Sequence, residues 1–219
     1  GGADEITVVD TIGVASPEAI GYLVERIGQW VAVPLAIHCH NDFGLGLANS
    51  LTALKAGAGC VHVSLNCLGE RAGNVDLAEV VMALKLLYGI DMGIRTERLA
   101  ETARLLEELS GYELSLTKPV VGKRIFTRES GGVVQQLVTS PPAVEPYSPE
   151  SVGLEREVVL GKKSGRYSVL HALGKLGLEA SDEEIDRLLA EVKSRSTQQR
   201  RLVSDDELRE MLLGSGPGS

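Results

Sequence analysis

Two histidines stand one residue apart in the segment IHCHNDFG, residues 37–44. If this segment begins as a β-strand, the alternation of side chains places His38 and His40 on one face of the sheet and Cys39 on the other. Neutral imidazoles are good ligands for Zn²⁺, and for Mn²⁺ or Mg²⁺ when carboxylates complete the site. The spacing is therefore compatible with a metal site, and also with two solvated histidines at a strand end.

Other polar residues fall at the ends of neighbouring predicted strands. Asp10 and Thr11 lie at the end of the first strand, and Asn74 closes the loop after the third. In a (β/α)8 barrel the carboxyl ends of the strands form the face that carries the active site. This common edge favours the metal interpretation. His62 and His171 lack such company, and we interpret them as a strand-face histidine and a helix-surface histidine.

The loop GERAGN, residues 69–74, combines an acid, a base and two glycines. One interpretation is a tight turn with a solvated ion pair between Glu70 and Arg71. The other is a rigid loop, permitted by its glycines, that holds Asn74 near a metal and Glu70 and Arg71 in a network. Cys67 has no adjacent histidine, so a reactive thiol is the less favoured interpretation of that residue.

The residues around these side chains alternate between short apolar runs and amphipathic stretches. Strands alternating with helices at this spacing predict βαβ units and a parallel sheet, so the predicted fold class is α/β. The predicted strands cover 6–10, 34–40 and 60–66. A first helix is predicted to begin at Pro17, with Ser16 as its N-cap, and two further helices are predicted over 45–56 and 76–87.

The chain changes character after Tyr88. An amphipathic helix is predicted over 96–109, and residues 111–165 are rich in loop-forming residues, with four prolines in TSPPAVEPYSPESVG. We expect four regions: barrel units over 1–92, a helix with a loop-rich linker and lid over 93–165, a small subdomain over 166–213, and a disordered tail over 214–219.

The small subdomain is predicted to be α/β or helical. Two capping-box signatures support helices there, because a serine is followed three residues later by a glutamate. These pairs are Ser181 with Glu184 and Ser204 with Glu207.

The composition is that of an ordinary globular protein, with 43% hydrophobic and 24% charged residues. The net charge of −8 and the absence of a dense basic stripe argue against a nucleic acid or an anionic membrane as partner. No apolar run approaches the roughly 20 residues of a membrane span, and the chain does not begin with a signal-peptide pattern. Three cysteines are an odd number, so we expect buried, reduced thiols in a cytoplasmic protein.

Five segments in order resemble the homocitrate synthase and 2-isopropylmalate synthase family of metal-dependent, acyl-CoA-condensing TIM-barrel enzymes. They are DTIGVASPE, HCHNDFGLGLANSLTALKAGA, NCLGERAGNVDLAEVVMALK, VVGKRIFTRESG and VVLGKKSGR. The match runs from residue 6 to about 170, and the overall pattern is most similar to homocitrate synthase. The motifs H-x-H-N-D-x-G and G-E-R-x-G-N are highly specific for this family.

The resemblance implies a condensation of acetyl-CoA with a 2-oxo acid that uses a divalent cation, Mg²⁺, Mn²⁺ or Zn²⁺. His38 and His40 match the family's metal-binding histidines, and Asn74 matches the asparagine that completes or supports the metal shell. Thr11, with Asp10 beside it, matches the substrate-binding position.

The resemblance also implies supporting and catalytic groups. Asp42 and Glu70 would orient the ligands. In the post-barrel motif F-T-H-E-S-G-I-H, Arg128 and Val133 replace histidines, and Val144 replaces a tyrosine while Tyr147 lies close by. Valine cannot move a proton, so Tyr147 or another group substitutes, or the chemistry has changed or been lost.

The resemblance covers only part of a barrel, since three βα units precede the post-barrel region and eight are needed. We therefore expect the last three units of a (β/α)8 barrel, completed by an N-terminal half from the same gene or a partner chain. An open part-barrel exposes strand edges that recruit partners. We also expect a homodimer, in which LGKKSG, with Lys163 in place of histidine, is either a structural turn or a lid over the neighbouring barrel.

Three hypotheses for function follow. The first is part of an acyltransferase of the homocitrate synthase type, with 2-oxoglutarate or a similar 2-oxo acid, or of the 2-isopropylmalate synthase type. The second is a degenerate, non-catalytic family member that acts in binding or assembly. The third is a lyase with the same barrel and metal. It ranks last because Cys67, although near the place where lyases of this kind carry a cysteine, precedes the synthase signature LGERAGN.

Overall fold

The computed structural model describes residues 2–214, which form two compact units that divide between Gly122 and Lys123. This division falls inside the segment 93–165, so the predicted boundaries at 92 and 165 do not coincide with it and stay predictions. Of the tail predicted to be disordered, residues 215–219 lie outside the described residues. Within the described part, no helix is both long and apolar enough to cross a membrane.

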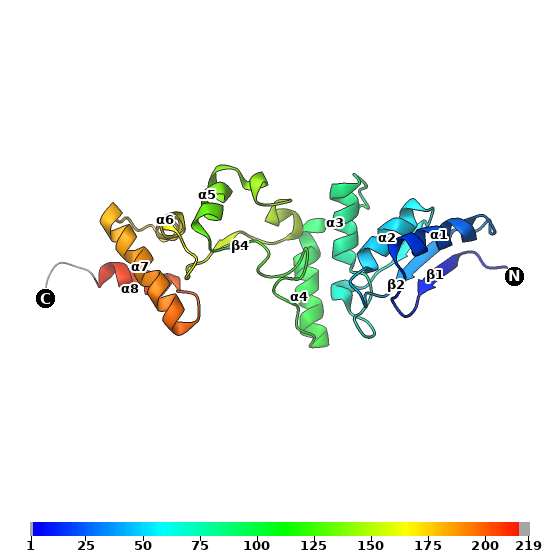
Figure 1. Cartoon of the computed structure of the whole chain (residues 1–219), viewed down its shortest axis with the longest axis horizontal. Coiled ribbons are helices and arrows are strands. Elements are labelled where there is room, and N and C mark those ends of the chain that lie inside the picture. The colour runs from blue at the N-terminus through cyan, green and yellow to red at the C-terminus, as the bar shows by residue number, and fades with distance from the viewer. Residues whose placement is uncertain (1, 215–219) are drawn as a thin grey trace. The chain divides into compact units, whose positions relative to one another are not determined.

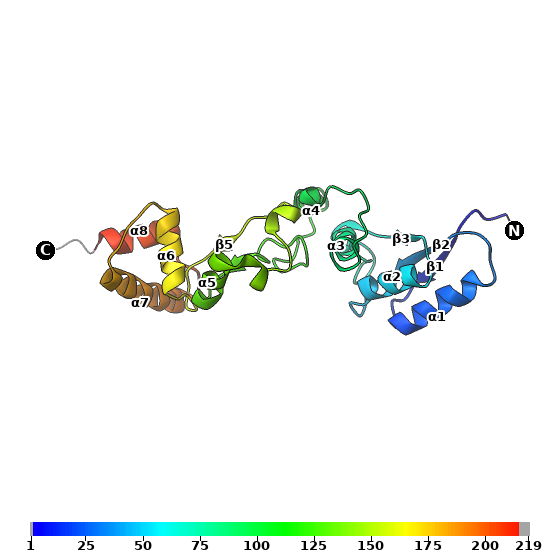
Figure 2. The same ribbon diagram turned by 90° about the horizontal axis from the view of Figure 1, so that it is seen from above.

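The first unit is built on a parallel sheet in the order β1-β2-β3, which confirms the α/β class. Helices α1 and α2 lie on the same side of this sheet in both views (Figures 1 and 2). The elements are β1 (Ile6–Asp10), α1 (Pro17–Gly28), β2 (Leu35–Cys39), α2 (Gly46–Lys55), β3 (Cys60–His62) and α3 (Leu77–Leu87).

Alternation along the strands decides which side chains face the helices. Val8, Ile37 and Cys39 point to the helix side and form a core with Ile20 and Val24 of α1. Burial of these apolar side chains holds the helices on the sheet. Local signals fix the helix starts: the Ser16 side chain accepts a hydrogen bond from the backbone N–H of Ala19, as predicted for an N-cap.

The opposite face of the sheet is open. Val9 is 49% exposed, and Cys60 and His62 are also exposed on this face. The three cysteines are free, but the prediction that all are buried is wrong for Cys60. Cys39 is buried, and burial raises the pKa of its thiol to about 11. The open face is compatible with a barrel wall, and the barrel itself stays a prediction.

The third strand is shorter than predicted. It ends at His62, and Leu65–Cys67 form a 3₁₀ turn instead of continuing the strand. Asn66 and Cys67 have φ values of 57° and 58°, in the left-handed region. The Asn66 amide donates to the carbonyl of Ala103 at 2.8 Å, a tertiary contact that stabilises this turn. That carbonyl belongs to α4 (Leu99–Ser110), which follows a 3₁₀ turn at Thr96–Arg98.

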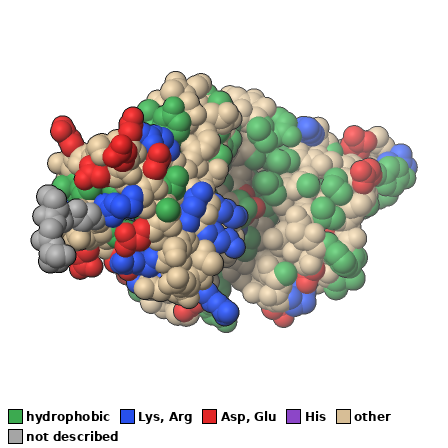
Figure 3. Space-filling model, turned by 60° about the vertical axis from the view of Figure 1, so that its left-hand side comes forward, with side chains coloured by type: hydrophobic (Ala, Val, Ile, Leu, Met, Phe, Trp, Pro, Cys, Tyr) green, Lys and Arg blue, Asp and Glu red, His purple; other side chains and the backbone are tan. Residues whose placement is uncertain are grey.

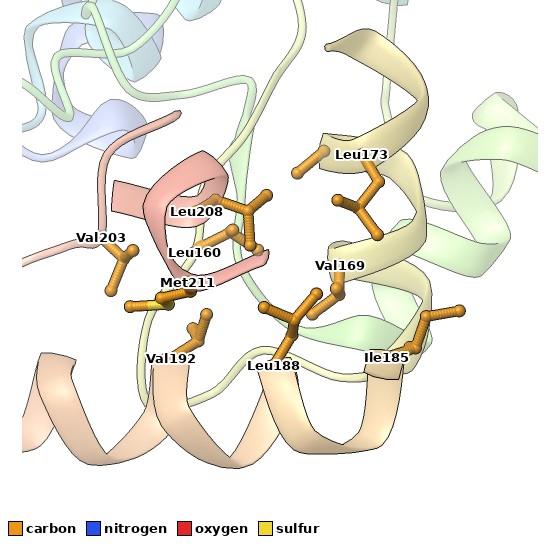
Figure 4. Close-up of a cluster of buried hydrophobic side chains, with 10 residues drawn as sticks. Leu160, Val169, Leu173, Ile185, Leu188, Val192, Val203, Leu208 and Met211 are labelled. Carbon is orange, nitrogen blue, oxygen red and sulfur yellow. The ribbon is translucent and has the colours of Figure 1, made fainter. Parts of the chain in front are cut away.

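The second unit pairs two short parallel strands and packs four helices. The predicted subdomain proves to be helical, and both capping boxes are confirmed, with serine and glutamate side chains bonding reciprocally to backbone N–H groups. The elements are β4 (Thr127–Arg128), α5 (Gly131–Thr139), β5 (Glu157–Val158), α6 (Arg166–Lys175), α7 (Asp182–Gln199) and α8 (Asp205–Leu213). Figure 4 shows the core of α6, α7 and α8, where Leu173, Leu188 and Leu208 converge.

Helix α5 lies in the segment predicted to be loop-rich, and the sequence patterns did not predict this helix. Its sequence, GGVVQQLVT, begins with two glycines and is rich in β-branched residues, so its intrinsic helix propensity is low. Packing of α5 against α6 compensates for this low helix propensity. A Cβ at Gly131 would lie 2.5 Å from the Cα of Gly165, so the two backbones approach as closely as glycines allow.

This close approach predicts opposite effects of alanine at adjacent glycines. Gly131→Ala should lower the free energy of unfolding by about 1–3 kcal/mol, because the new methyl group has no room. Gly132→Ala, whose Cβ would meet nothing within 4 Å, should be neutral or stabilising by up to about 1 kcal/mol. Urea denaturation followed by circular dichroism measures both. Equal effects of the two substitutions would contradict the packing.

The N-terminus of α8 predicts acid sensitivity. The side-chain hydrogen bonds from Arg201 to Glu207, followed by the backbone bond from Ser204, lower the pKa of Glu207 from 4.5 to about 2. Because the folded-state pKa is lowered, the stabilisation is present above pH 4.5 and is lost as the pH falls towards 2. Glu207→Gln keeps a capping residue but removes this titration, so its stability should fall less steeply below pH 4.5. Glu210→Gln is the control and should retain the wild-type slope.

Candidate metal centre

His38 and His40 project from the same face at the carboxyl end of β2. Their ring centroids are 5.2 Å apart, and the ring planes are inclined by 66°. Imidazoles that share one cation, each with an N–metal distance of about 2.1 Å, have ring centroids about 5 Å apart. The spacing of the two rings is therefore that of two ligands to one ion.

Asn74 is brought to these rings by the backbone. It pairs with His40 in an isolated antiparallel bridge, and the flanking bonds join Asn41 N to Gly73 O at 2.9 Å and Val75 N to Cys39 O at 3.2 Å. The loop after β3 thus returns to the end of β2. Burial lowers the pKa of His38, and the neighbouring His40 and His62 lower it further, while a hydrogen bond with Asn74 acts in the opposite direction.

Two buried atoms in this group have no hydrogen-bond partner within the described residues. They are His40 Nδ1 and Asn74 Oδ1. Buried polar atoms are nearly always paired. The amide oxygen has lone pairs, and an unprotonated imidazole nitrogen has one, that can bind a metal cation. Two imidazoles and one amide oxygen form a donor set that fits a divalent cation. Among the residues that the structure describes, no cluster of three His, Cys, Asp or Glu side chains completes a site, so a carboxylate ligand is lacking.

His62 belongs to the same surface, which corrects the prediction that it stands apart. In the sheet register His62 pairs with His38, and the ring centroids of these two lie 5.8 Å apart. The signal was present in the sequence, since parallel neighbours with the same alternation share a face. It becomes decisive only when the register between β2 and β3 is known.

Arg71 joins three loops at this edge of the sheet. Its guanidinium donates two hydrogen bonds to the Asp42 carboxylate, at 2.9 and 3.0 Å, and one to the backbone carbonyl of Thr11 at 2.8 Å. The hydrogen bond from Arg71 lowers the pKa of Asp42. The predicted network is confirmed for Arg71. The Glu70 side chain is 84% exposed, and its carboxylate forms an ion pair with the Arg71 guanidinium at 3.8 Å, as the first interpretation of this loop predicted.

Gly13 is required by the same contacts. It has a φ of 65°, and a Cβ there would lie 2.3 Å from a carboxylate oxygen of Asp42. A larger residue would therefore push the first loop away from the Arg71–Asp42 pair.

Asp10 has a structural contact that its sequence position did not reveal. It is 8% exposed, and its two carboxylate oxygens accept hydrogen bonds from the backbone N–H groups of Val14 and Ala15, both at 3.2 Å. Asp10 therefore shapes the turn before α1. The side chain of the next residue, Thr11, is exposed at the sheet edge. The substrate contacts predicted for Asp10 and Thr11 stay predictions.

In comparison with known proteins, two protein families match successive parts of the chain. The HMGL-like family matches residues 1–106, and the homocitrate synthase post-HMGL domain-like family matches residues 120–200. Homocitrate synthase AksA of Methanopyrus kandleri is 43% identical over 96% of this chain. The chain belongs to the homocitrate synthase and 2-isopropylmalate synthase family.

Other relatives carry both names of the family. "Probable 2-isopropylmalate synthase" of Methanopyrus kandleri is 44% identical over 88% of this chain, and homocitrate synthase AksA of Methanothermobacter thermautotrophicus is 38% identical over 94%. A solved hydroxymethylglutaryl-CoA lyase from Pseudomonas aeruginosa is 28% identical, with a TM-score of 0.47, over 52% of this chain and 40% of its own. The chain spans 53%, 38% and 52% of the three curated relatives, about half their length or less.

The region that matches the homocitrate synthase post-HMGL domain-like family lies almost entirely in the second unit. Tyr147 packs edge-on against Phe126, with ring centroids 5.6 Å apart, and burial raises the pKa of its hydroxyl. Arg128 donates hydrogen bonds to the backbone carbonyls of Ile125 and Thr127 at 2.8 and 3.0 Å, so its guanidinium has a structural contact in this unit.

Lys118 forms a buried ion cluster that the sequence did not reveal. Its ammonium contacts the carboxylate of Glu79, lies 3.5 Å from Asp76 and lies 3.2 Å from the sulfur of Cys67. The Lys118 side chain is 13% exposed and that of Asp76 only 1%. Burial alone would lower the pKa of Lys118, but the hydrogen bond to Glu79 and the charges of Asp76 and Glu79 raise it.

This cluster lies directly behind the G-E-R-x-G-N loop of the family. Asp76 also caps α3, accepting from the N–H of Ala78 at 2.7 Å. Lys118 therefore fixes the helix that follows Asn74. More than 30 residues separate Lys118 from each of its side-chain partners, so no local sequence pattern predicts this ion cluster.

Removal of the buried ammonium should be strongly destabilising. Lys118→Met leaves the buried carboxylate of Asp76 and the partly buried carboxylate of Glu79 without this counter-ion, and we expect a loss of about 3–5 kcal/mol in the free energy of unfolding. Lys55→Met is the matched control in the same unit, because Lys55 is exposed and its ammonium lies over the ring of Tyr88, a contact worth about 1 kcal/mol or less. Urea titration of both variants tests this, and similar losses would contradict a buried role for Lys118.

Proposed function

We propose that the chain is the C-terminal portion of an acyltransferase that condenses acetyl-CoA with a 2-oxo acid, 2-oxoglutarate or a similar molecule. His38, His40 and Asn74 would bind its divalent cation, Mg²⁺, Mn²⁺ or Zn²⁺. The observation that carries this proposal is the pair of imidazoles 5.2 Å apart, together with two buried atoms, His40 Nδ1 and Asn74 Oδ1, that find no hydrogen-bond partner over residues 2–214.

A divalent cation bound there would polarise the carbonyl group of a 2-oxo acid. The exposed Thr11 side chain would contact the substrate carboxylate, next to Asp10. Arg71 holds the loops of Thr11 and Asp42 in place through three hydrogen bonds, which supports a fixed substrate position. Each turnover would remove a methyl proton from acetyl-CoA, form the carbon–carbon bond, and hydrolyse the thioester to release the free thiol of CoA.

Glu70 and Tyr147 are the proposed catalytic residues. Glu70 is exposed at the sheet edge and can accept a proton or orient a ligand. Tyr147 carries a phenolic hydroxyl, a group that can donate a proton, on a half-buried ring that packs against Phe126. We propose this role for Tyr147 because Val133 and Val144 have no exchangeable side-chain proton.

We further propose that an N-terminal half-barrel, from the same gene or a partner chain, completes the sheet and supplies the missing carboxylate. The open face supports this, since β1 and β3 are the edge strands of the described sheet and Val9 is 49% exposed. A homodimer and a cytoplasmic location complete the proposal.

Substitutions at two of the three proposed ligands test the metal centre. His40→Ala should weaken Mn²⁺ binding by about 100-fold or more, and Asn74→Ala by about 10–100-fold, the loss typical of a group that supports a ligand. His171→Ala, on the exposed surface of α6, should bind Mn²⁺ like the wild type. The paramagnetic resonance signal of free Mn²⁺ reports the affinity. Equal affinities in all variants would remove the proposed centre.

The reaction itself is tested by complementation. The chain is combined with the N-terminal half-barrel of a homocitrate synthase relative, a divalent metal, acetyl-CoA and a panel of 2-oxo acids. We expect release of free thiol that requires both halves and one particular oxo acid. If thiol release were no faster than the background hydrolysis of acetyl-CoA with every oxo acid, the catalytic proposal would be overturned.

A second candidate function is non-catalytic assembly or binding within the family. Val133 and Val144, at positions where the family carries a histidine and a tyrosine, favour it. In this case the complemented protein would bind metal through His38 and His40 but release no thiol.

A further inference from the structure

The second unit contains a hollow lined with basic side chains. Its volume is about 890 Å³, and its lining includes Arg124, Lys162, Arg200 and Arg201, with Glu129 as the only acid. Figure 3 shows Lys and Arg side chains gathered on one face of the unit that carries the C-terminus. This concentration is local, because residues 123–219 contain 14 Lys and Arg against 15 Asp and Glu.

Three of the four cations have no carboxylate partner among the residues that the structure describes. They are Arg124, Lys162 and Arg200, whose side chains make no ion pair. Arg201 is partly neutralised, because it donates two hydrogen bonds to Glu207 at 2.7 and 2.8 Å. The single acid of the lining is also engaged, since Glu129 accepts from the backbone N–H of Lys163 at 2.7 Å. The hollow therefore carries uncompensated positive charge.

The backbone that bears these cations is fixed by specific contacts. Gly161 packs so closely on Glu129 that a Cβ would lie 2.5 Å from the carboxylate oxygen, and its N–H donates to the Ser164 hydroxyl at 2.9 Å. These bonds place Lys162 at the rim. At the other side, Arg200 ends α7 in a left-handed conformation with a φ of 52°, and the hydroxyl of buried Ser196 donates to the carbonyl of Arg201 at 2.7 Å.

We propose that this hollow binds a small anion that carries at least two phosphate groups. Concave sites with one sign of charge concentrate their field on a ligand, and guanidinium groups recognise phosphate oxygens in pairs. Three unpaired cations from three separate segments exceed what a single carboxylate needs. The volume is that of a site for a molecule of nucleotide size, not of a lone inorganic ion.

Two sources share this chemistry: a nucleoside diphosphate, and the phosphorylated adenosine diphosphate part of coenzyme A. The second source rests on the proposed acyl transfer, whereas the anion site itself does not. The segment GKKSG, which the sequence left as either a turn or a lid, would then supply a ligand-binding side chain, Lys162.

The test is isothermal titration of the chain with inorganic pyrophosphate, ADP and coenzyme A at low ionic strength. We expect binding of all three, weakened about tenfold by Arg124→Gln or Arg200→Gln and more by Lys162→Glu. Tighter binding of coenzyme A than of ADP would identify coenzyme A as the natural ligand. Tighter binding of ADP would identify a nucleoside diphosphate. Added salt should weaken each interaction.

Matched controls separate a built site from general attraction. Lys193→Glu and Arg209→Gln make the same charge changes at exposed positions of α7 and α8 outside the hollow. They should change the affinities by less than twofold, and circular dichroism should show all variants folded. Absence of binding at millimolar pyrophosphate, or equal losses in site and control variants, would overturn the proposal. Since the readout is binding, failure of acyl transfer leaves it unaffected.

Discussion

The pairing of His40 with Asn74 is the constraint on which the candidate site depends. Parallel register between β1, β2 and β3 brings the carboxyl ends of all three strands to one edge. The isolated bridge then returns the loop after β3 to the end of β2, so the Asn74 side chain lies within hydrogen-bond distance of His38. Because the backbone makes this contact, the arrangement does not require a ligand to form.

Two positively charged side chains, Arg71 and Lys118, hold the surrounding loops. Their removal is expected to lower the free energy of unfolding by different amounts. Arg71 is 40% exposed and joins the loops of Thr11 and Asp42 at the open edge. Lys118 is almost buried and neutralises the carboxylates of Asp76 and Glu79 behind the loop. Exposed pairs contribute little to stability, whereas a buried charge without its partner is strongly destabilising. Arg71 therefore acts on the geometry of the site and Lys118 on the integrity of the unit.

Local signals predicted the parts of the structure that short-range physics decides. Apolar runs and caps such as Ser16 and Ser181 located strands and helices, and alternation placed His38 and His40 on one face. Contacts between distant residues decided the rest. The contact of the left-handed Asn66 with Ala103 shaped a turn where the strand was predicted to continue, and Gly131 allowed α5 to form against Gly165. The nearness of His62 required the strand register, and the partners of Lys118 required the tertiary fold.

The most direct test of the account is pulsed paramagnetic resonance of Mn²⁺ bound to the protein with ¹⁵N-labelled histidine. The account predicts couplings from two coordinated imidazole nitrogens. One coupling should be lost in His38→Gln and the other in His40→Gln, while His62→Gln should retain both. A spectrum without imidazole coupling, or coupling that disappears only in His62→Gln, would contradict the proposed centre.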